Sequence, residues 1–222
     1  MSFRSAKMPL ILLGAGGHAK VMLRLAETAG YKVIGVCDPH LAAQPQVEWR
    51  GVPLLGGDDA LSSLDPASVE LINGVGQLVS CRVRAVIYQT MLLKGFRFPS
   101  LVHSSAWVSP CVSLADGVQV MAGAIIQPDC EIGENSIINT SASVDHDCFV
   151  AENVHIAPGA RLCGGVRVGT GAFIGSGAIV LQGVKVGEGA IVGAGVTLTR
   201  DLAPRSTRIG AASRIKSQLQ QE

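Results

Sequence analysis

One short stretch, SVDHDCFV at residues 143–150, gathers side chains that could do acid–base chemistry. A histidine, His146, lies between two carboxylates, Asp145 and Asp147, in a region built mainly from Val, Ile, Ala and Gly. A carboxylate beside an imidazole favours the protonated ring and can orient it, and this pairing is the usual way to build a general base. We therefore interpret His146 as a candidate general base, with a solvated surface histidine as the alternative.

The sequence around His146 follows a strict six-residue repeat. Every sixth residue from Val102 to Leu198 is aliphatic, and four residues after each comes a small residue such as Ala124, Cys130 or Cys148. The residue before the small one is usually Gly, Asn or Asp, which tolerate positive φ at tight turns. This period is typical of a left-handed parallel β-helix, in which three hexads make one triangular coil.

The repeat assigns a place to each residue that interrupts it. His146 follows the inward-facing Val144 by two residues, so we expect it at an outward corner that solvent, a ligand or a neighbouring subunit can reach. Cys130 and Cys148 are 18 residues apart and should stack in one interior column. His155, in NVHIAPG, is a second polar interruption, and either a structural or a ligand-binding role fits it.

The chain before the repeat alternates strand and helix patterns. We expect strands at residues 10–13, 32–38 and 69–76, helices at 21–31 and 80–95, and a loop containing GVPLLGG at 51–57. Such alternation indicates an α/β domain with a parallel sheet. We place this domain at residues 1–98 and the β-helix at residues 99–222.

A glycine-rich turn lies between the first expected strand and the first expected helix. Gly14, Gly16 and Ala19 give the pattern G-x-G-x-x-A, and Asp38 follows Gly14 by 24 residues. Glycines let a phosphate approach the backbone, and the N-terminus of the next helix attracts it. A full dinucleotide-binding fold has two mononucleotide-binding halves, and the segment before the repeat has room for only about one of them. We therefore expect this turn to bind a nucleotide diphosphate other than NAD. A simple tight turn is the alternative.

The composition argues against several classes of protein. The 222 residues are 48% hydrophobic and 16% charged with a net charge of +1, which does not suggest binding to nucleic acid or to a membrane surface. The apolar run near the N-terminus is too short for a signal peptide core or a membrane span, so we expect a cytoplasmic protein. The six cysteines have no metal-ligand spacing, and we expect them to be small buried residues in a protein that needs no metal.

Four segments of the chain resemble the hexapeptide-repeat sugar acyltransferases of the NeuD/PglD type. They are LLGAGGHAK, IINTSASVDHDC, VHIAPGARLCGGVRVG and AFIGSGAIVLQGVKVGEGAIVGAGV. The resemblance implies a small Rossmann-like domain followed by a left-handed β-helix, and a homotrimer that binds acetyl-CoA along the prism between two subunits. It implies N-acetylation of a UDP- or GDP-linked amino-dideoxy sugar by direct transfer. A sugar or sialic acid O-acetyltransferase and a non-catalytic nucleotide-sugar-binding scaffold are the alternatives.

The resemblance also implies roles for individual residues. His146 would be the general base and Asp147 the acid that raises its basicity, although the better-studied amino-sugar enzymes have Glu where Asp147 stands. The residues expected to contact acetyl-CoA are His155, Gly164, Ser176 and Ala194, with the Gly164 N–H facing the thioester oxygen. Those expected at the nucleotide-sugar site are Gly14, Ala15, Gly16, Asp38 and Gly76.

The segment after Leu198 is basic. It contains Arg200, Arg205, Arg208, Arg214 and Lys216. Two interpretations fit it equally: a cap on the open end of the prism, or a cluster that meets the phosphates of acetyl-CoA. The closing G-x-P-A of the family stands here as GAAS at residues 210–213, which leaves the path of this tail open.

Overall fold

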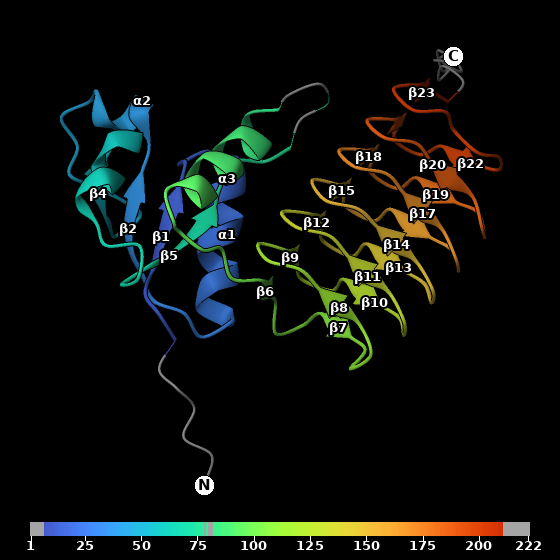
Figure 1. The fold of residues 1–222 in the computed structure, drawn as a ribbon, viewed down its shortest axis with the longest axis horizontal. Helices are drawn as coiled ribbons and strands as arrows, with labels where there is room; N and C mark the ends of the chain where they lie inside the picture. Colours follow the sequence, from blue (N-terminus) through green and yellow to red (C-terminus); the bar gives the residue numbers. More distant parts are fainter. Residues whose placement is uncertain (1–6, 78, 80–81, 211–222) are drawn as a thin grey trace, which may run out of the picture.

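The computed structural model describes residues 7–77, 79 and 82–210, which form an α/β domain followed by a three-sided prism of short strands (Figure 1). The α/β domain contains β1 (Leu10–Leu13), α1 (Gly17–Thr28), β2 (Val33–Cys37), α2 (Pro39–Ala42), β3 (Glu48–Trp49), β4 (Val52–Gly56), a 3-10 helix η1 (Asp58–Ser63), β5 (Glu70–Asn73) and α3 (Val83–Leu93). Its sheet has the strand order β3-β4-β2-β1-β5.

The sheet is parallel except at one edge. β4, β2, β1 and β5 are parallel neighbours, and β3 joins β4 as a short antiparallel strand. All four residues of β1 are buried, because Leu10 and Leu12 pack with α1 while Ile11 and Leu13 pack with α3. The parallel sheet expected from the strand–helix alternation is confirmed.

Three details of the α/β domain differ from the expectations. The segment expected as a loop is strand β4, in which Val52 is buried and Pro53 exposed, as period-two alternation requires. Helix α1 begins at Gly17, four residues earlier than expected, and its Val21 is 45% exposed because Met22 and Leu25 face the sheet instead. Helix α3 begins at Val83; residues 80 and 81 lie outside the described residues.

The prism has three parallel sheets. The domain-facing sheet contains β6 (Leu101–Val102), β9 (Gln119–Val120), β12 (Ile137–Ile138), β15 (His155–Ile156), β18 (Phe173–Ile174), β21 (Ile191–Val192) and β23 (Thr207–Arg208). The Trp107 sheet contains β7 (Trp107–Val108), β10 (Ile125–Ile126), β13 (Ser143–Val144), β16 (Arg161–Leu162), β19 (Ile179–Val180) and β22 (Thr197–Leu198). The Phe149 sheet contains β8 (Ser113–Leu114), β11 (Glu131–Ile132), β14 (Phe149–Val150), β17 (Arg167–Val168) and β20 (Lys185–Val186).

The register of these sheets confirms the triangular coil. Ile126 pairs with Val144, which is the same position one coil later. The aliphatic residue of each hexad points into the prism, and the small residue beside each turn is buried with it. The residue before the small one has positive φ in most turns, for example Asp129 and Asn135. The six-residue pattern therefore fixes which side chains face inward and which form the corners.

The cysteines only partly follow the expectation that they are small buried residues. Cys37, Cys130 and Cys148 are buried, whereas Cys111 is exposed and Cys163 is half-buried. Cys111 and Cys163 occupy turn positions from which side chains point away from the core, so the expectation was wrong for these two. Cys81 lies outside the described residues.

The α/β domain packs on the domain-facing sheet (Figure 1). Met22 of α1 shares one buried cluster with Leu101, Met121 and Ile137 of the prism. This contact places the carboxyl ends of β1 and β5 beside the middle coils of the prism. The relation between the glycine-rich turn and the prism is therefore set by an apolar interface.

A buried arginine adds a polar link across the same interface. The guanidinium of Arg84 in α3 is 2% exposed and donates to the carbonyl oxygens of Asn73 (3.1 Å), Val75 (2.8 Å) and Asn135 (3.2 Å). Burial lowers the pKa of Arg84 to about 9. Because Asn73 ends β5 and Val75 follows it while Asn135 belongs to the prism, Arg84 fixes the end of β5 and its loop against the prism.

The prism continues past the last expected hexad at Leu198. Strand β23 adds to β21, and the Asp201 side chain accepts a hydrogen bond of 2.8 Å from the Lys185 N–H. These contacts fit the capping interpretation of the tail up to Gly210. Residues 211–222, which include most of GAAS together with Arg214 and Lys216, lie outside the described residues.

Candidate active site

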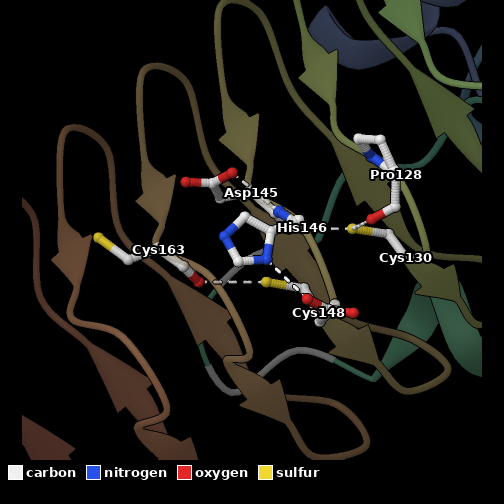
Figure 2. Close-up of polar contacts among 7 residues, drawn as sticks. Pro128, Cys130, Asp145, His146, Cys148 and Cys163 are labelled. Carbon is white, nitrogen blue, oxygen red and sulfur yellow. Dashed lines mark hydrogen bonds and ion pairs between the residues drawn. The ribbon is translucent and has the colours of Figure 1, made fainter.

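His146 lies at the corner between β13 and β14, with a side chain that is 54% exposed (Figure 2). Its Nδ1 is 2.6 Å from Oδ2 of Asp147, and its backbone N–H donates to Oδ1 of Asp145 at 2.8 Å. Asp147 takes the left-handed turn position with φ of 60°, which places its short carboxylate next to the ring. The outward corner expected for His146 is confirmed. Asp147 contacts the imidazole ring, whereas Asp145 contacts the backbone N–H of the same residue.

The electrostatics of the corner favour a proton on His146. The hydrogen bond to Asp147, followed by the charge of Asp145, raises the pKa of His146 above its usual value. When Nδ1–H donates to Asp147, the lone pair of the neutral ring is on Nε2. Nε2 has no hydrogen-bond partner within the described part of the chain. The ring is therefore oriented by one nitrogen and able to accept a proton at the other.

Gly164 lies one coil further along the same edge and directly against the ring. A Cβ at this position would be 2.7 Å from both Cε1 and Nε2 of His146. The neighbouring Gly165 N–H donates to the His146 carbonyl oxygen at 2.9 Å, which ties the two coils together. The Gly164 N–H has no partner among residues 82–210 and the described residues before them. It is a free donor beside the candidate base.

The five residues expected at the nucleotide-sugar site come together at the carboxyl end of the parallel sheet. Gly14 follows β1 with φ of +86°, and the Ala15 N–H donates to Oδ2 of Asp38 at 2.8 Å. The other oxygen of Asp38 caps α2, so this carboxylate orders the turn. Gly76 lies against the side chain of His18. Ligands of open α/β sheets bind at this edge.

Helix α1 begins at this turn without a side-chain cap. Its N-cap residue is Gly16, and a Cβ added there would meet no atom within 4 Å. The N-terminus of α1 therefore has no side-chain cap and lies next to open space at Gly16, as an anion-binding helix N-terminus requires.

The comparisons with known families cover both parts of the chain. Residues 9–91 match the PglD N-terminal domain. Residues 111–146 and 147–182 match the bacterial transferase hexapeptide, and residues 165–200 match the hexapeptide repeat of succinyl-transferase. No curated protein sequence matched the chain.

Solved structures match over nearly the full length. The acetyltransferase domain of PglB from Neisseria gonorrhoeae FA1090, solved with acetyl coenzyme A, is 35% identical with a TM-score of 0.82, covering 90% of this chain and 95% of that one. A mutant of perosamine N-acetyltransferase from Caulobacter crescentus, solved with CoA and GDP-perosamine, is 37% identical with a TM-score of 0.83, covering 95% and 97%. The chain belongs to the PglD/NeuD-type family of hexapeptide-repeat sugar acetyltransferases. Its expected architecture, a Rossmann-like domain followed by a left-handed parallel β-helix, is confirmed.

The other residues that the family suggests for acetyl-CoA lie away from the edge of His146. Ser176 and Ala194 are exposed at corners between the domain-facing sheet and the Trp107 sheet. Within one chain they are therefore on a different edge of the prism from His146 and Gly164.

His155 is the least accessible of these residues. It is 8% exposed on β15, where its Nδ1–H donates to the Gln77 carbonyl oxygen at 3.2 Å and its Nε2 accepts from Asn139 at 3.0 Å. Burial lowers the pKa of His155 to about 4, and the edge of its ring meets Phe173. Both nitrogens are already used, so a ligand could reach only the carbon atoms of the ring.

Sequence reasoning missed a set of polar residues behind the glycine-rich turn, in which Gln119 and Asn73 are buried and His18 is half-buried. Nε2 of His18 is 2.8 Å from Oε1 of Gln119, whose amide nitrogen donates to the Asn73 carbonyl oxygen at 2.8 Å. Burial, with a contribution from the charge of Arg84, lowers the pKa of His18 to about 4. The only sequence signal was Gln119, a polar side chain in the first position of a prism strand.

A cleft of about 380 Å³ opens elsewhere, between the start of α3 and the prism. Its lining includes Arg82, Phe173, Glu188 and Arg205. Neither His146 nor the glycine-rich turn lines it, so we do not assign the reaction to this cleft.

The described residues include neither a cluster of metal ligands nor a membrane-spanning helix. No group of three or more His, Cys, Asp or Glu side chains is placed to hold a metal ion. None of the helices described here is long and apolar enough to cross a membrane.

Proposed function

We propose that this protein transfers the acetyl group of acetyl-CoA to the amine of a UDP- or GDP-linked amino-dideoxy sugar, with His146 as the general base. The observation that carries the proposal is the His146–Asp147 pair beside the free Gly164 N–H. Chains of similar fold and more than 30% identity were solved with acetyl-CoA or with CoA and GDP-perosamine, which supports both substrates.

The geometry of the corner suits direct acyl transfer. The sugar amine forms a bond to the thioester carbon, and Nε2 of His146 takes a proton from that nitrogen. Such a base contributes roughly 10²–10⁴ in rate. The Gly164 N–H donates to the oxyanion of the tetrahedral intermediate. The C–S bond then breaks, and the proton passes from His146 to the leaving CoA sulfur, so no covalent enzyme intermediate is needed.

In this proposal residues 1–98 hold the nucleotide sugar. The diphosphate binds at Gly14, Ala15 and Gly16, beside the uncapped positive end of α1 and the open space at Gly16. Asp38 and Gly76 complete the site for the nucleoside and sugar. The residues proposed to contact acetyl-CoA are His155, Gly164, Ser176 and Ala194.

The positions of the two sites within one chain support a homotrimer. The glycine-rich turn packs on the domain-facing sheet, whereas His146 lies on the edge opposite that sheet, between the Trp107 and Phe149 sheets. A nucleotide sugar held by one α/β domain would therefore meet His146 of a neighbouring subunit. The paired residues Trp107 and Ile125 are 50% and 41% exposed and provide an apolar surface beside that edge.

We also propose that the enzyme works in the cytoplasm, where acetyl-CoA and nucleotide sugars are available.

Light scattering tests the homotrimer: a fully active monomer of 23.0 kDa would contradict it.

The test of activity is acetyl-CoA turnover with a panel of nucleotide sugars, followed by mass spectrometry of the products. We expect one acetyl group on the amine of a 4-amino sugar, and little or no product with the His146→Ala variant. Acetylation of hydroxyl sugars alone would show an O-acetyltransferase. Binding of nucleotide sugars without turnover would show a scaffold.

A further inference from the structure

Two cysteine side chains are inserted into the two turns that carry the proposed catalytic groups (Figure 2). The Cys148 thiol donates to the carbonyl oxygen of Cys163 at 3.2 Å. Within the described residues this oxygen accepts no direct hydrogen bond from the Val166 N–H, so the thiol takes the place of the bond that would close the turn at residues 163–166, which contains Gly164.

Cys130 does the same one coil earlier. Its thiol donates to the Asp145 carbonyl oxygen at 3.0 Å, with a longer contact of 3.8 Å to the Pro128 carbonyl oxygen. The Asp145 oxygen belongs to the turn at residues 145–148, which contains His146, and within the described residues it accepts no direct hydrogen bond from the Cys148 N–H.

The same edge of the prism also contains a turn without an inserted sulfur. This turn is at residues 181–184, one coil beyond Gly164. Val166 stands beside it in the interior column that contains Cys130 and Cys148, and its side chain offers no hydrogen-bond donor. There the Leu181 carbonyl oxygen accepts directly from the Val184 N–H at 3.2 Å. A turn of this edge is therefore able to close without a bridging atom.

On another edge of the prism, a serine hydroxyl links the two ends of a turn by acting as both donor and acceptor. The Ser136 hydroxyl donates to the Ala151 carbonyl oxygen at 2.9 Å and accepts from the Val154 N–H at 3.0 Å. Ser136 has the same spacing to its turn as Cys148 has to residues 163–166. A hydroxyl at such a position is therefore able to replace the thiol.

The carbonyl group held by Cys148 belongs to the peptide unit that supplies the Gly164 N–H. A peptide unit is planar, so fixing the oxygen of Cys163 also fixes the direction of the N–H on its other side. A hydrogen bond to the carbonyl oxygen also polarises the peptide and strengthens its N–H as a donor. The thiol thus controls both the direction and the strength of the free Gly164 donor.

We propose that Cys148 is a positioning residue for acetyl transfer, whose thiol holds the Cys163–Gly164 peptide so that the Gly164 N–H points at the thioester oxygen. This inference rests on the proposed function, in which Gly164 stabilises the oxyanion. Cys148 itself is 1% exposed and does not touch a substrate. The adjacent Cys130 thiol, together with burial, raises the pKa of Cys148, so its sulfur keeps the proton that it donates.

The test compares Cys148→Ala, Cys148→Ser and Cys148→Val with the wild type. Alanine and valine remove the donor, and valine keeps the volume of a column in which Val166 and Val184 already stand. We expect kcat to fall about 10- to 100-fold in both, part of the 10²–10³ that loss of a whole oxyanion donor costs. We expect KM for both substrates to stay near the wild-type value. Serine should restore most of kcat.

Ser136→Ala is the matched control, because it removes the same kind of bridge from a turn that carries no proposed catalytic group. It should lower Tm about as much as Cys148→Ala does and leave kcat unchanged. Wild-type kcat in Cys148→Ala and Cys148→Val would overturn the inference. An equal loss of kcat in Ser136→Ala, or no recovery in Cys148→Ser, would also overturn it.

A crystal structure of Cys148→Ala decides the structural step independently of activity. We expect the turn at residues 163–166 to close directly, with Cys163 O and Val166 N approaching the 3.2 Å seen between Leu181 and Val184. An unchanged turn would overturn the inference even where the proposed function holds. By contrast, wild-type turnover in His146→Ala would contradict the proposed function and leave the crystal structure to decide the role of the thiol.

Discussion

The α-carbon of Gly164 lies against the His146 ring, so that a Cβ at position 164 would be 2.7 Å from Cε1 and Nε2. The ring is exposed and is held by its contact with Asp147, so Gly164→Ala should push the base outward, away from that contact, and leave the core of the prism intact. We expect kcat to fall about 100-fold, within the range that a general base contributes. Steady-state kinetics and Tm measure the two effects separately. A variant with normal Tm and normal kcat would show that the contact does not matter for catalysis.

Asp147→Asn should change the pH profile as well as the rate. The hydrogen bond to Asp147 is the first cause of the raised pKa of His146, so the substitution should lower that pKa. A general base acts in its neutral form, which is present above its pKa. The acid limb of kcat/KM should therefore move to lower pH.

The plateau of kcat/KM in Asp147→Asn should also fall, because the ring is less basic and less well oriented. We expect a smaller loss than in His146→Ala. Asp145→Asn is the comparison, because the Asp145 carboxylate binds the backbone N–H and affects the ring only through its charge. An acid limb that stays in place in Asp147→Asn would argue against His146 as the titrating base.

The sequence was sufficient to predict the corner of His146 because the repeat determines which residues face inward. The same 18-residue coil also places position 164 beside position 146, as the pairing of Ile126 with Val144 illustrates. The link from Arg84 to Asn135 could not be predicted in this way. It joins helix α3 of one domain to a turn of the other, and no periodic pattern relates the two.

The extent of the α/β sheet was also only partly predictable. β4 has a proline and three glycines in or next to it, which favour a turn in local sequence. It is nevertheless a strand, because β2 offers it a parallel neighbour. Tertiary pairing decided this segment, and a single sequence shows no sign of that pairing.

Gly16→Val should weaken nucleotide-sugar binding selectively. The space beside Gly16 is open, and a branched side chain there would fill the region proposed for the diphosphate. We expect KM for the nucleotide sugar to rise by about tenfold or more, as steric loss of a charge-assisted phosphate contact implies. KM for acetyl-CoA, for which we propose a site on the prism, should change little.

Calorimetry with UDP, GDP, NAD and NADP gives an independent test of the same turn. We expect a nucleoside diphosphate to bind to the wild type and to bind more weakly to Gly16→Val. Tight NAD binding without a response to UDP or GDP would contradict the assignment of the turn.

Two histidines, the buried His155 and the half-buried His18, should make the folded protein sensitive to acid. Burial lowers the pKa of both His18 and His155 to about 4 from a usual value near 6.5. Between these values the unfolded chain binds protons that the folded chain does not, so the free energy of unfolding falls as pH is lowered from 6.5 toward 4. Each histidine can account for a loss of up to about 3 kcal/mol over that window.

The contacts of His155 explain why protonation is costly there. Its Nε2 accepts a hydrogen bond from the Asn139 amide, so a proton added to Nε2 would face another donor. The positive charge of Arg84 also disfavours a protonated ring. His155→Gln should therefore flatten the fall of Tm between pH 6.5 and 4, although it lowers Tm at neutral pH by removing the contact with Phe173. His40→Gln, on the exposed surface of α2, is the control and should leave the profile unchanged. Thermal melts across this pH range measure all three proteins, and an identical acid profile for wild type and His155→Gln would rule out His155 as a source of acid sensitivity.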